Sequence, residues 1–154
     1  MIVEYNKYIK RPCVSFDFDG VLHLSMVKGT IHPLNYDDYK SWIPSIKMHR
    51  ILRSEHRAGN KIVLISARGK FGWIPEDDIV YEMKPVIQKF LKKYHLPVDQ
   101  IILTSDQPKA QFLKNINTIR HYDDNWNLIY ELDEDTHFEF VYVHNDEIID
   151  RIKL

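Results

Sequence analysis

The stretch SFDFDGVLH, residues 15–23, places two carboxylates, Asp17 and Asp19, directly behind an apolar run and just before Gly20. Residues 14–18 are β-prone and mostly apolar, which predicts a buried strand that ends near the glycine. A pair of negative charges at the end of a buried strand indicates a functional site, and the residues that follow the other strands indicate its chemistry.

Four further apolar segments predict strands, and helical patterns fall between them. The expected strands cover residues 62–65, 101–103, 118–122 and 138–143, and the expected helices cover 45–58, 85–94, 108–116 and 125–132. Strands that alternate with helices predict parallel pairing with right-handed crossovers. We therefore expect an α/β, Rossmann-like three-layer sandwich around a central, mostly parallel sheet of about five strands.

Composition sets limits on the class of protein. With 154 residues, 44% of them hydrophobic, the chain suits a single domain over 1–154. A net charge of -1 gives no overall attraction to nucleic acid or to an acidic membrane. Cys13 is the single cysteine, which excludes a disulfide within the chain, and we expect no signal peptide and no membrane-spanning segment, because no stretch has the pattern of either. These features predict a cytoplasmic protein with no membrane partner, and they leave its oligomeric state open.

Polar side chains follow each of the first four expected strands. In parallel sheets, functional groups gather at the carboxyl ends of the strands. The residues at these ends are Asp17 and Asp19, then Ser66 and Arg68, then Thr104, Ser105, Asp106 and Lys109, and last Asp123 and Asp124. The pattern predicts one site at one edge of the sheet.

The carboxylates of the first and fourth strands, Asp17, Asp19, Asp123 and Asp124, repel each other unless a cation lies between them, and hard oxygen ligands suit Mg²⁺. Asp17 and Asp123 are the first candidate ligands, with Asp124 as another ligand or as a group that orients a bound water. The Ser66 hydroxyl and the Lys109 ammonium are suited to phosphate. Among eight histidines, His121 stands out because it lies close to Asp123.

Four motifs resemble those of the haloacid dehalogenase-like (HAD) phosphohydrolase superfamily, in the family's order. DFDGVL resembles the first motif, Ser66 the second, Lys109 the third, and HYDDN with its paired aspartates the fourth. The resemblance implies that Asp17 is the nucleophile and a metal ligand, and that Asp19 is the general acid and base and a backbone ligand of Mg²⁺. It also implies that Ser66, Ala67 and Lys109 bind the phosphoryl group, and that Asp123 and Asp124 bind the metal.

The sequence also suggests a class of substrate. The two positions where the family carries caps, residues 21–44 and 69–83, are too short for a folded cap, although the first has room for a hairpin turning at Lys28 and Gly29. SAR, residues 66–68, resembles the Ser/Thr-Gly-Arg of polynucleotide 3′-phosphatase modules, with Ala67 in place of glycine. Arg68 and Lys70 are therefore expected to bind substrate.

A nucleotide or a polynucleotide 3′-end phosphate is the favoured substrate of this phosphomonoesterase. Phe71 and Trp73, which follow Arg68 and Lys70, could stack a base, but packing is the more expected role. The alternatives are a phosphatase of small metabolites or phosphoproteins, a phosphotransferase to an alcohol, and an inactive binding module. A receiver domain fits poorly, because its lysine follows the acidic residues, whereas Lys109 precedes Asp123 and Asp124.

Overall fold

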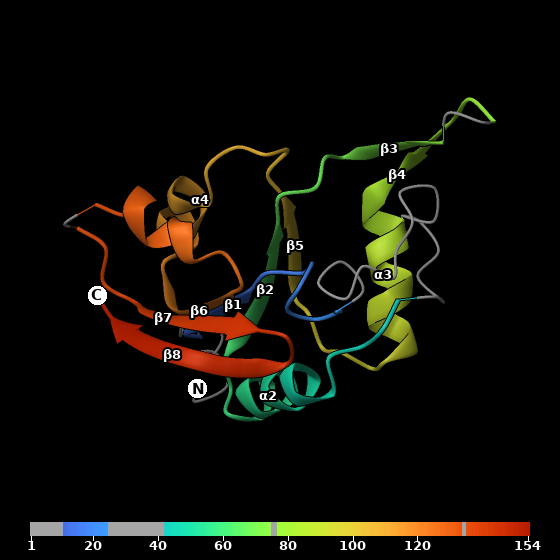
Figure 1. Ribbon diagram of the computed structural model, residues 1–154. Helices are drawn as coiled ribbons and strands as arrows, with labels where there is room; N and C mark the ends of the chain where they lie inside the picture. Colours follow the sequence, from blue (N-terminus) through green and yellow to red (C-terminus); the bar gives the residue numbers. More distant parts are fainter. Residues whose placement is uncertain (1–10, 25–41, 75–76, 134) are drawn as a thin grey trace, which may run out of the picture.

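The computed structural model describes residues 11–24, 42–74, 77–133 and 135–154. Its centre is a six-stranded sheet in the order β5-β2-β1-β6-β7-β8 (Figure 1). The strands are β1 (Cys13–Phe16), β2 (Lys61–Ser66), β5 (Gln100–Leu103), β6 (Thr118–Asp123), β7 (Glu139–His144) and β8 (Glu147–Lys153). The first five in sheet order run parallel, and β8 pairs antiparallel with β7. The predicted Rossmann-like α/β architecture is confirmed, with β8 as an additional edge strand.

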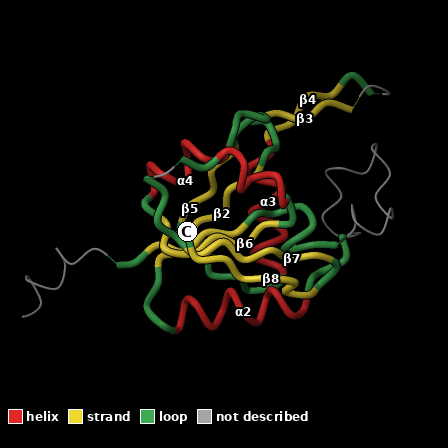
Figure 2. The backbone as a smooth tube through the Cα atoms, turned by 60° about the vertical axis from the view of Figure 1, so that its left-hand side comes forward, coloured by secondary structure: helices red, strands yellow, loops and turns green. Residues whose placement is uncertain are grey.

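Helices cover both faces of the sheet, as Figures 1 and 2 show for α2 and α4 on opposite sides. The helices are α2 (Ile46–Arg57), α3 (Met83–Lys93), α4 (Lys109–Ile116) and the 3-10 helix η3 (Trp126–Glu131). Ser45 caps α2, because its Oγ accepts the Met48 N–H at 3.3 Å. The helix expected over 125–132 is the 3-10 helix η3. The Asn125 side chain caps it by accepting the Asn127 N–H at 3.1 Å.

The strand β1 presents two chemically different faces. Val14 and Phe16 point into the large core that α2 and α3 complete, and Phe16 stacks on Tyr122 of β6 with ring centroids 4.5 Å apart. The alternate positions face the side of α4 and η3, because side chains alternate along a strand. Ser15 lies fully buried on that side, and Asp17 follows it by two residues. The alternation in the opening stretch therefore sends its polar residues toward α4.

A two-stranded antiparallel ribbon, β3 (Phe71–Ile74) and β4 (Ile79–Glu82), projects from the body of the molecule (Figures 1 and 2). The favoured expectation that Phe71 and Trp73 pack within the protein is wrong, since they are 63% and 61% exposed. Tyr81 explains the difference, because its ring occupies the space that a Cβ on Gly72 would take. Tyr81 also packs on the main core, so one face of the ribbon is closed and its aromatic face points outward.

The two expected cap positions differ in what the structure describes. The hairpin expected within 21–44 lies mostly outside the described residues, but the ends of this segment meet. The Leu24 N–H donates to the Ile43 carbonyl at 2.8 Å, and the Ser45 N–H donates to the Leu22 carbonyl at 3.1 Å. Within its described residues, the second position holds the ribbon and no larger unit. No described helix combines the length and the apolarity needed to cross a membrane.

Candidate active site

The carboxyl ends of β1 and β6 and the start of α4 enclose a cleft of about 380 Å³. Carboxylates and one lysine dominate its lining. The residues that line it include Asp17, Asp19, Ala67, Asp106, Lys109, Asp123 and Asp124. Because parallel strands end together at one edge of the sheet, side chains more than 100 positions apart in the chain share this cleft.

Lys109 connects the two central aspartates. Its Nζ lies 2.8 Å from Asp17 Oδ1 and 2.8 Å from Asp123 Oδ2. Burial raises the pKa of Asp17 well above its usual range, the charge of Asp123 adds to this, and Lys109 opposes it. Burial alone would lower the pKa of Lys109, but the two carboxylates hold it above its ordinary value. Lys109 is therefore a fixed positive charge between two acidic groups.

Three carboxylates converge in a way that suits a divalent cation. One oxygen from each of Asp17, Asp123 and Asp124 lies within 4.8 Å of the others. Burial and the neighbouring charge of Asp123 raise the pKa of Asp124 to about 6, so the cluster is electrostatically crowded. Two buried carboxylates and a half-buried one form a set of hard oxygen donors that fits Mg²⁺, and the cation would relieve such crowding. The Asp19 side chain does not belong to this group.

Asp123 is held by three donors. His121 Nε2 and Lys109 Nζ both lie 2.8 Å from Oδ2, and the Asn125 N–H donates to Oδ1 at 2.9 Å. Burial alone would raise the pKa of Asp123, but Lys109 and then His121 hold it below its usual range. Burial lowers the pKa of His121, and the contact with Asp123 only partly offsets this. Asp123 is thus an ionised carboxylate beside a neutral imidazole.

Asp19 is bound to Arg68 and His23. Arg68 Nε donates to Oδ2 at 2.8 Å and Nη2 to Oδ1 at 2.6 Å, while His23 Nε2 lies 2.6 Å from Oδ1. Burial alone would raise the pKa of Asp19, but the hydrogen bonds from Arg68 and His23 hold it well below its usual range. The Arg68 guanidinium also lies over the Trp42 ring, 4.8 Å from its centroid. Arg68 is therefore a buried partner of Asp19, and sequence spacing carries no signal for this pair.

The remaining expected site residues occupy different places. Ser66 ends β2, is fully buried, and accepts the Arg68 backbone N–H at 3.2 Å through its Oγ. Ala67 lines the cleft. Lys70 lies outside it, in a separate hollow of about 320 Å³ at the base of the ribbon that Phe71 and Lys84 also line. The residues brought together in the acidic cleft are Asp17, Asp19, Ala67, Lys109, Asp123 and Asp124. Ser66 is buried and is not one of the residues that line it.

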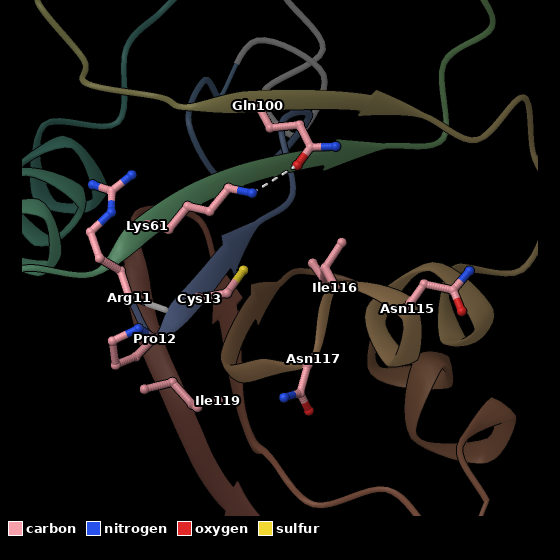
Figure 3. Close-up of a pocket in the computed structure, with 9 residues that line it drawn as sticks. All are labelled: Arg11, Pro12, Cys13, Lys61, Gln100, Asn115, Ile116, Asn117 and Ile119. Atoms are coloured by element: carbon pink, nitrogen blue, oxygen red, sulfur yellow. Dashed lines mark hydrogen bonds between the residues drawn. The ribbon is translucent and has the colours of Figure 1, made fainter. Parts of the chain in front are cut away.

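A larger cavity of about 640 Å³ lies at the opposite, amino ends of the strands (Figure 3). Arg11, Cys13 and Lys61 are among its lining residues, and Lys61 donates a hydrogen bond to Gln100 at 3.3 Å. None of the described residues that line it is a carboxylate, and burial raises the pKa of the Cys13 thiol, which makes the sulfur a poor nucleophile. The acidic cleft is therefore the stronger candidate for chemistry.

Comparisons with known proteins give a structural likeness only. No protein-family model matches the sequence, and no curated protein matches it significantly. A chain of the Pnkp1/Rnl/Hen1 complex superposes with a TM-score of 0.62 at 17% identity, over 88% of this chain and 47% of that one. A chain of the Pnkp1/Rnl/Hen1 RNA repair complex gives 0.60 at 16% identity, over 88% and 45%.

A D,D-heptose 1,7-bisphosphate phosphatase from B. bronchiseptica, complexed with magnesium and phosphate, gives a TM-score of 0.49 at 11% identity, over 76% of this chain and 72% of that one. The present chain spans about half the length of the two chains from the Pnkp1/Rnl/Hen1 complex. At these identities the likeness concerns the fold alone, the α/β architecture described above.

Proposed function

We propose that this chain is a Mg²⁺-dependent phosphomonoesterase that works through a phosphorylated Asp17. The observation that carries the proposal is the position of Lys109 Nζ, 2.8 Å from both Asp17 and Asp123, beside three carboxylates whose oxygens lie within 4.8 Å of one another. One cation is built into this cleft and a second fits among its oxygens. Such a site is suited to a phosphoryl group, which brings negative charge of its own.

The reaction has two in-line steps. The Asp17 carboxylate attacks phosphorus, the bond from phosphorus to the leaving oxygen breaks, and Asp19 donates a proton to that oxygen. A water molecule then loses a proton to Asp19 and attacks phosphorus, which breaks the bond to Asp17 and releases inorganic phosphate. Bound Mg²⁺ would supply positive charge that offsets the charge of the carboxylates and the phosphoryl oxygens. Asp17, Asp123 and Asp124 would hold it, together with the backbone carbonyl of Asp19.

Asp19 has to be released before it can exchange protons. Both of its oxygens accept hydrogen bonds from Arg68, and one is also in contact with His23. An ionised carboxylate has no proton to donate, so Asp19 has to take up a proton from solvent before the first step. The proposed role therefore requires that substrate binding loosen at least one of these contacts.

Nucleotides or polynucleotide 3′-ends are the proposed substrates. Phe71 and Trp73 lie exposed on one ribbon face, and Lys70 and Lys84 line the hollow at its base. Aromatic side chains beside cations can stack bases and follow a phosphate backbone. The likeness to chains of an RNA repair complex supports the same class of substrate.

Phosphate release with Mg²⁺ tests the proposal directly. The substrates are a 3′-phosphorylated oligonucleotide, its 5′-phosphorylated counterpart, a mononucleotide and an aryl phosphate, each also treated with Asp17→Asn protein and with EDTA. We expect preferential release from the 3′-end and none with Asp17→Asn or EDTA. Release only from small esters would reject the polynucleotide substrate, and full activity of Asp17→Asn would reject the mechanism.

A further inference from the structure

A row of buried polar side chains runs behind the acidic cleft, on the face of the sheet that α4 covers. Thr118 Oγ1 lies 2.9 Å from Ser15 Oγ, and Ser15 Oγ lies 2.8 Å from His121 Nδ1. The other ring nitrogen, His121 Nε2, lies 2.8 Å from Asp123 Oδ2. Ser15, His121 and Asp123 are fully buried, and Thr118 is 4% exposed. The chemistry proposed above uses Asp123 but not the three residues behind it.

An irregularity in β6 brings these side chains to one face. Cys13 pairs with Thr118 and Val14 pairs with Arg120, so Ile119 has no partner on β1. Without this bulge, Thr118 and His121 would point to opposite faces, because three positions separate them. With it, both lie on the face of Ser15, which pairs directly with His121. The backbone thus departs from regular pairing at the place that builds the row.

The hydrogen bonds in the row have a defined direction at His121. A carboxylate oxygen accepts hydrogen bonds, so the contact between Asp123 and His121 places an N–H donor at His121 Nε2. The other ring nitrogen, Nδ1, contacts the Ser15 hydroxyl. Ser15 therefore holds the orientation in which the ring meets Asp123.

This arrangement determines which Asp123 oxygen remains for a cation. Oδ2 already takes His121 Nε2 and Lys109 Nζ, each at 2.8 Å. Among the described residues, Oδ1 takes only the Asn125 N–H, at 2.9 Å, which leaves it a lone pair. The His121 ring, held in place, opposes rotation of the carboxylate plane away from the orientation that presents this lone pair to a cation.

We propose that His121 is a positioning residue that, held by Ser15, orients the Asp123 carboxylate for a divalent cation. The inference rests on the proposed function insofar as Asp123 binds the metal, but not on the identity of the substrate. A histidine that merely fills buried space would stabilise the fold without affecting cation affinity. Groups behind a metal ligand typically change metal affinity by about 10- to 100-fold when removed.

Titration calorimetry of the full chain with Mg²⁺ alone tests this, because it needs no turnover. His121→Leu keeps the volume and removes the donor, and we expect about 10- to 100-fold weaker Mg²⁺ binding. His121→Gln restores an N–H toward Asp123. Its Mg²⁺ affinity should stay within about fivefold of wild type, which is a smaller loss than that expected for His121→Leu. Ser15→Ala should weaken binding in the wild-type background but not in the His121→Leu background, since its effect passes through the ring.

Ser45→Ala is the matched control, because it also removes a buried hydroxyl but at the start of α2, and it should leave Mg²⁺ affinity unchanged. If His121→Leu fails to fold, the His121→Gln and Ser15→Ala proteins still decide the matter. Wild-type affinity in a folded His121→Leu protein, or equal Ser15→Ala effects in both backgrounds, would overturn the inference and leave the phosphatase proposal intact. If His121→Leu binds Mg²⁺ more weakly than wild type and the wild-type protein releases no phosphate, the inference is supported and the phosphatase proposal is rejected. A wild-type protein that binds no Mg²⁺ would reject both.

Discussion

Asp19 and Arg68 form a two-point ion pair, with N–O distances of 2.8 and 2.6 Å, across 49 positions of sequence. The guanidinium lies above the rings of Trp42 and Phe18, at 4.8 and 5.3 Å from their centroids. The pair therefore joins the first motif to the loop after β2 and to the core below. It also keeps the proposed general acid ionised, so it contributes to stability and restrains the chemistry at once.

Replacing Arg68 with Gln should lower the free energy of unfolding at pH 7 by about 2 kcal/mol, because a mostly buried carboxylate loses its charged partner. The value is modest because the Asp19 side chain is 26% exposed. The folded-state pKa of Asp19 is lowered, so this stabilisation is present above the ordinary carboxyl pKa of about 4 and is lost as the pH falls below it.

Urea unfolding at pH 7 and pH 3 measures the effect, and the difference between the two proteins should shrink at pH 3. Arg151→Gln is the control, because its pair with Glu139 leaves the Arg151 side chain 50% exposed and should contribute at most about 0.5 kcal/mol. An equal loss in both variants would contradict a special role for the Arg68 pair.

Lys109→Met should lower kcat/KM for phosphate release by about 10²–10³-fold, the size expected when a preorganised charge is removed from a site where negative charge develops. Methionine keeps most of the length of the side chain, so the loss reports on the charge. Lys114→Met is the matched control on the same helix, since Lys114 is 58% exposed and pairs with Asp133 at 3.5 Å. The kcat/KM of the control should stay within about twofold of wild type, as expected for a surface pair. A similar fall in kcat/KM in both variants would exclude a role for Lys109 in the site.

The raised pKa of Asp124 predicts that Mg²⁺ binding depends on pH. Burial and the charge of Asp123 raise this pKa to about 6, so Asp124 is largely protonated at pH 5 and ionised at pH 7.5. A protonated carboxyl is a poor cation ligand. We expect Mg²⁺ affinity to rise between these two pH values and the rise to be smaller in Asp124→Asn. Titration at both pH values checks this, and an unchanged pH dependence in the variant would assign the effect to another group.

Periodicity and parallel topology were enough to predict the sheet and most of the acidic cleft. Asp17 follows β1, Asp123 ends β6 and Lys109 begins α4, and these three ends lie at the same edge of the sheet. The contacts among the three side chains therefore follow from the order of strands and helices. The partner of Arg68 could not be predicted, because the contact depends on how two loops pack. Arg68 was expected to bind substrate, which stays a prediction, and the structure adds that its guanidinium is hydrogen-bonded to Asp19.

Irregular backbone accounts for the other differences. The bulge at Ile119 breaks the two-residue alternation, so no strand pattern reveals that Thr118 shares a face with His121. The ribbon has an alternating pattern, but alternation does not say which neighbour covers its apolar face. Tyr81 decides this by packing over Gly72, which leaves Phe71 and Trp73 outside.

Glu55→Ala should destabilise the fold by about 2–3 kcal/mol without changing phosphate release. The substitution leaves the partly buried Arg120 guanidinium without its carboxylate partner. Glu55 accepts from Arg120 at 2.6 and 2.9 Å and from the Tyr122 hydroxyl at 3.0 Å, and so joins α2 to β6. Chemical denaturation and the phosphate assay measure the two effects. Glu139→Ala, which removes a more exposed pair with Arg151, is the control, and a comparable loss there would contradict the argument.

Trp73→Ala should weaken turnover of oligonucleotides but not of aryl phosphates, because its ring is available for stacking and contributes little to the core. It is 61% exposed, with its Nε1 donating to Asp78 at 3.1 Å. Loss of one stacked base costs about 1–3 kcal/mol, so KM for a 3′-phosphorylated oligonucleotide should rise by about 5- to 150-fold. Tyr130→Ala removes another exposed aromatic side chain, on η3, and should leave both substrates unaffected. Comparison of KM for the two substrates in each variant decides the matter: an equal rise for aryl phosphate, or none for the oligonucleotide, would exclude the ribbon as a surface for bases.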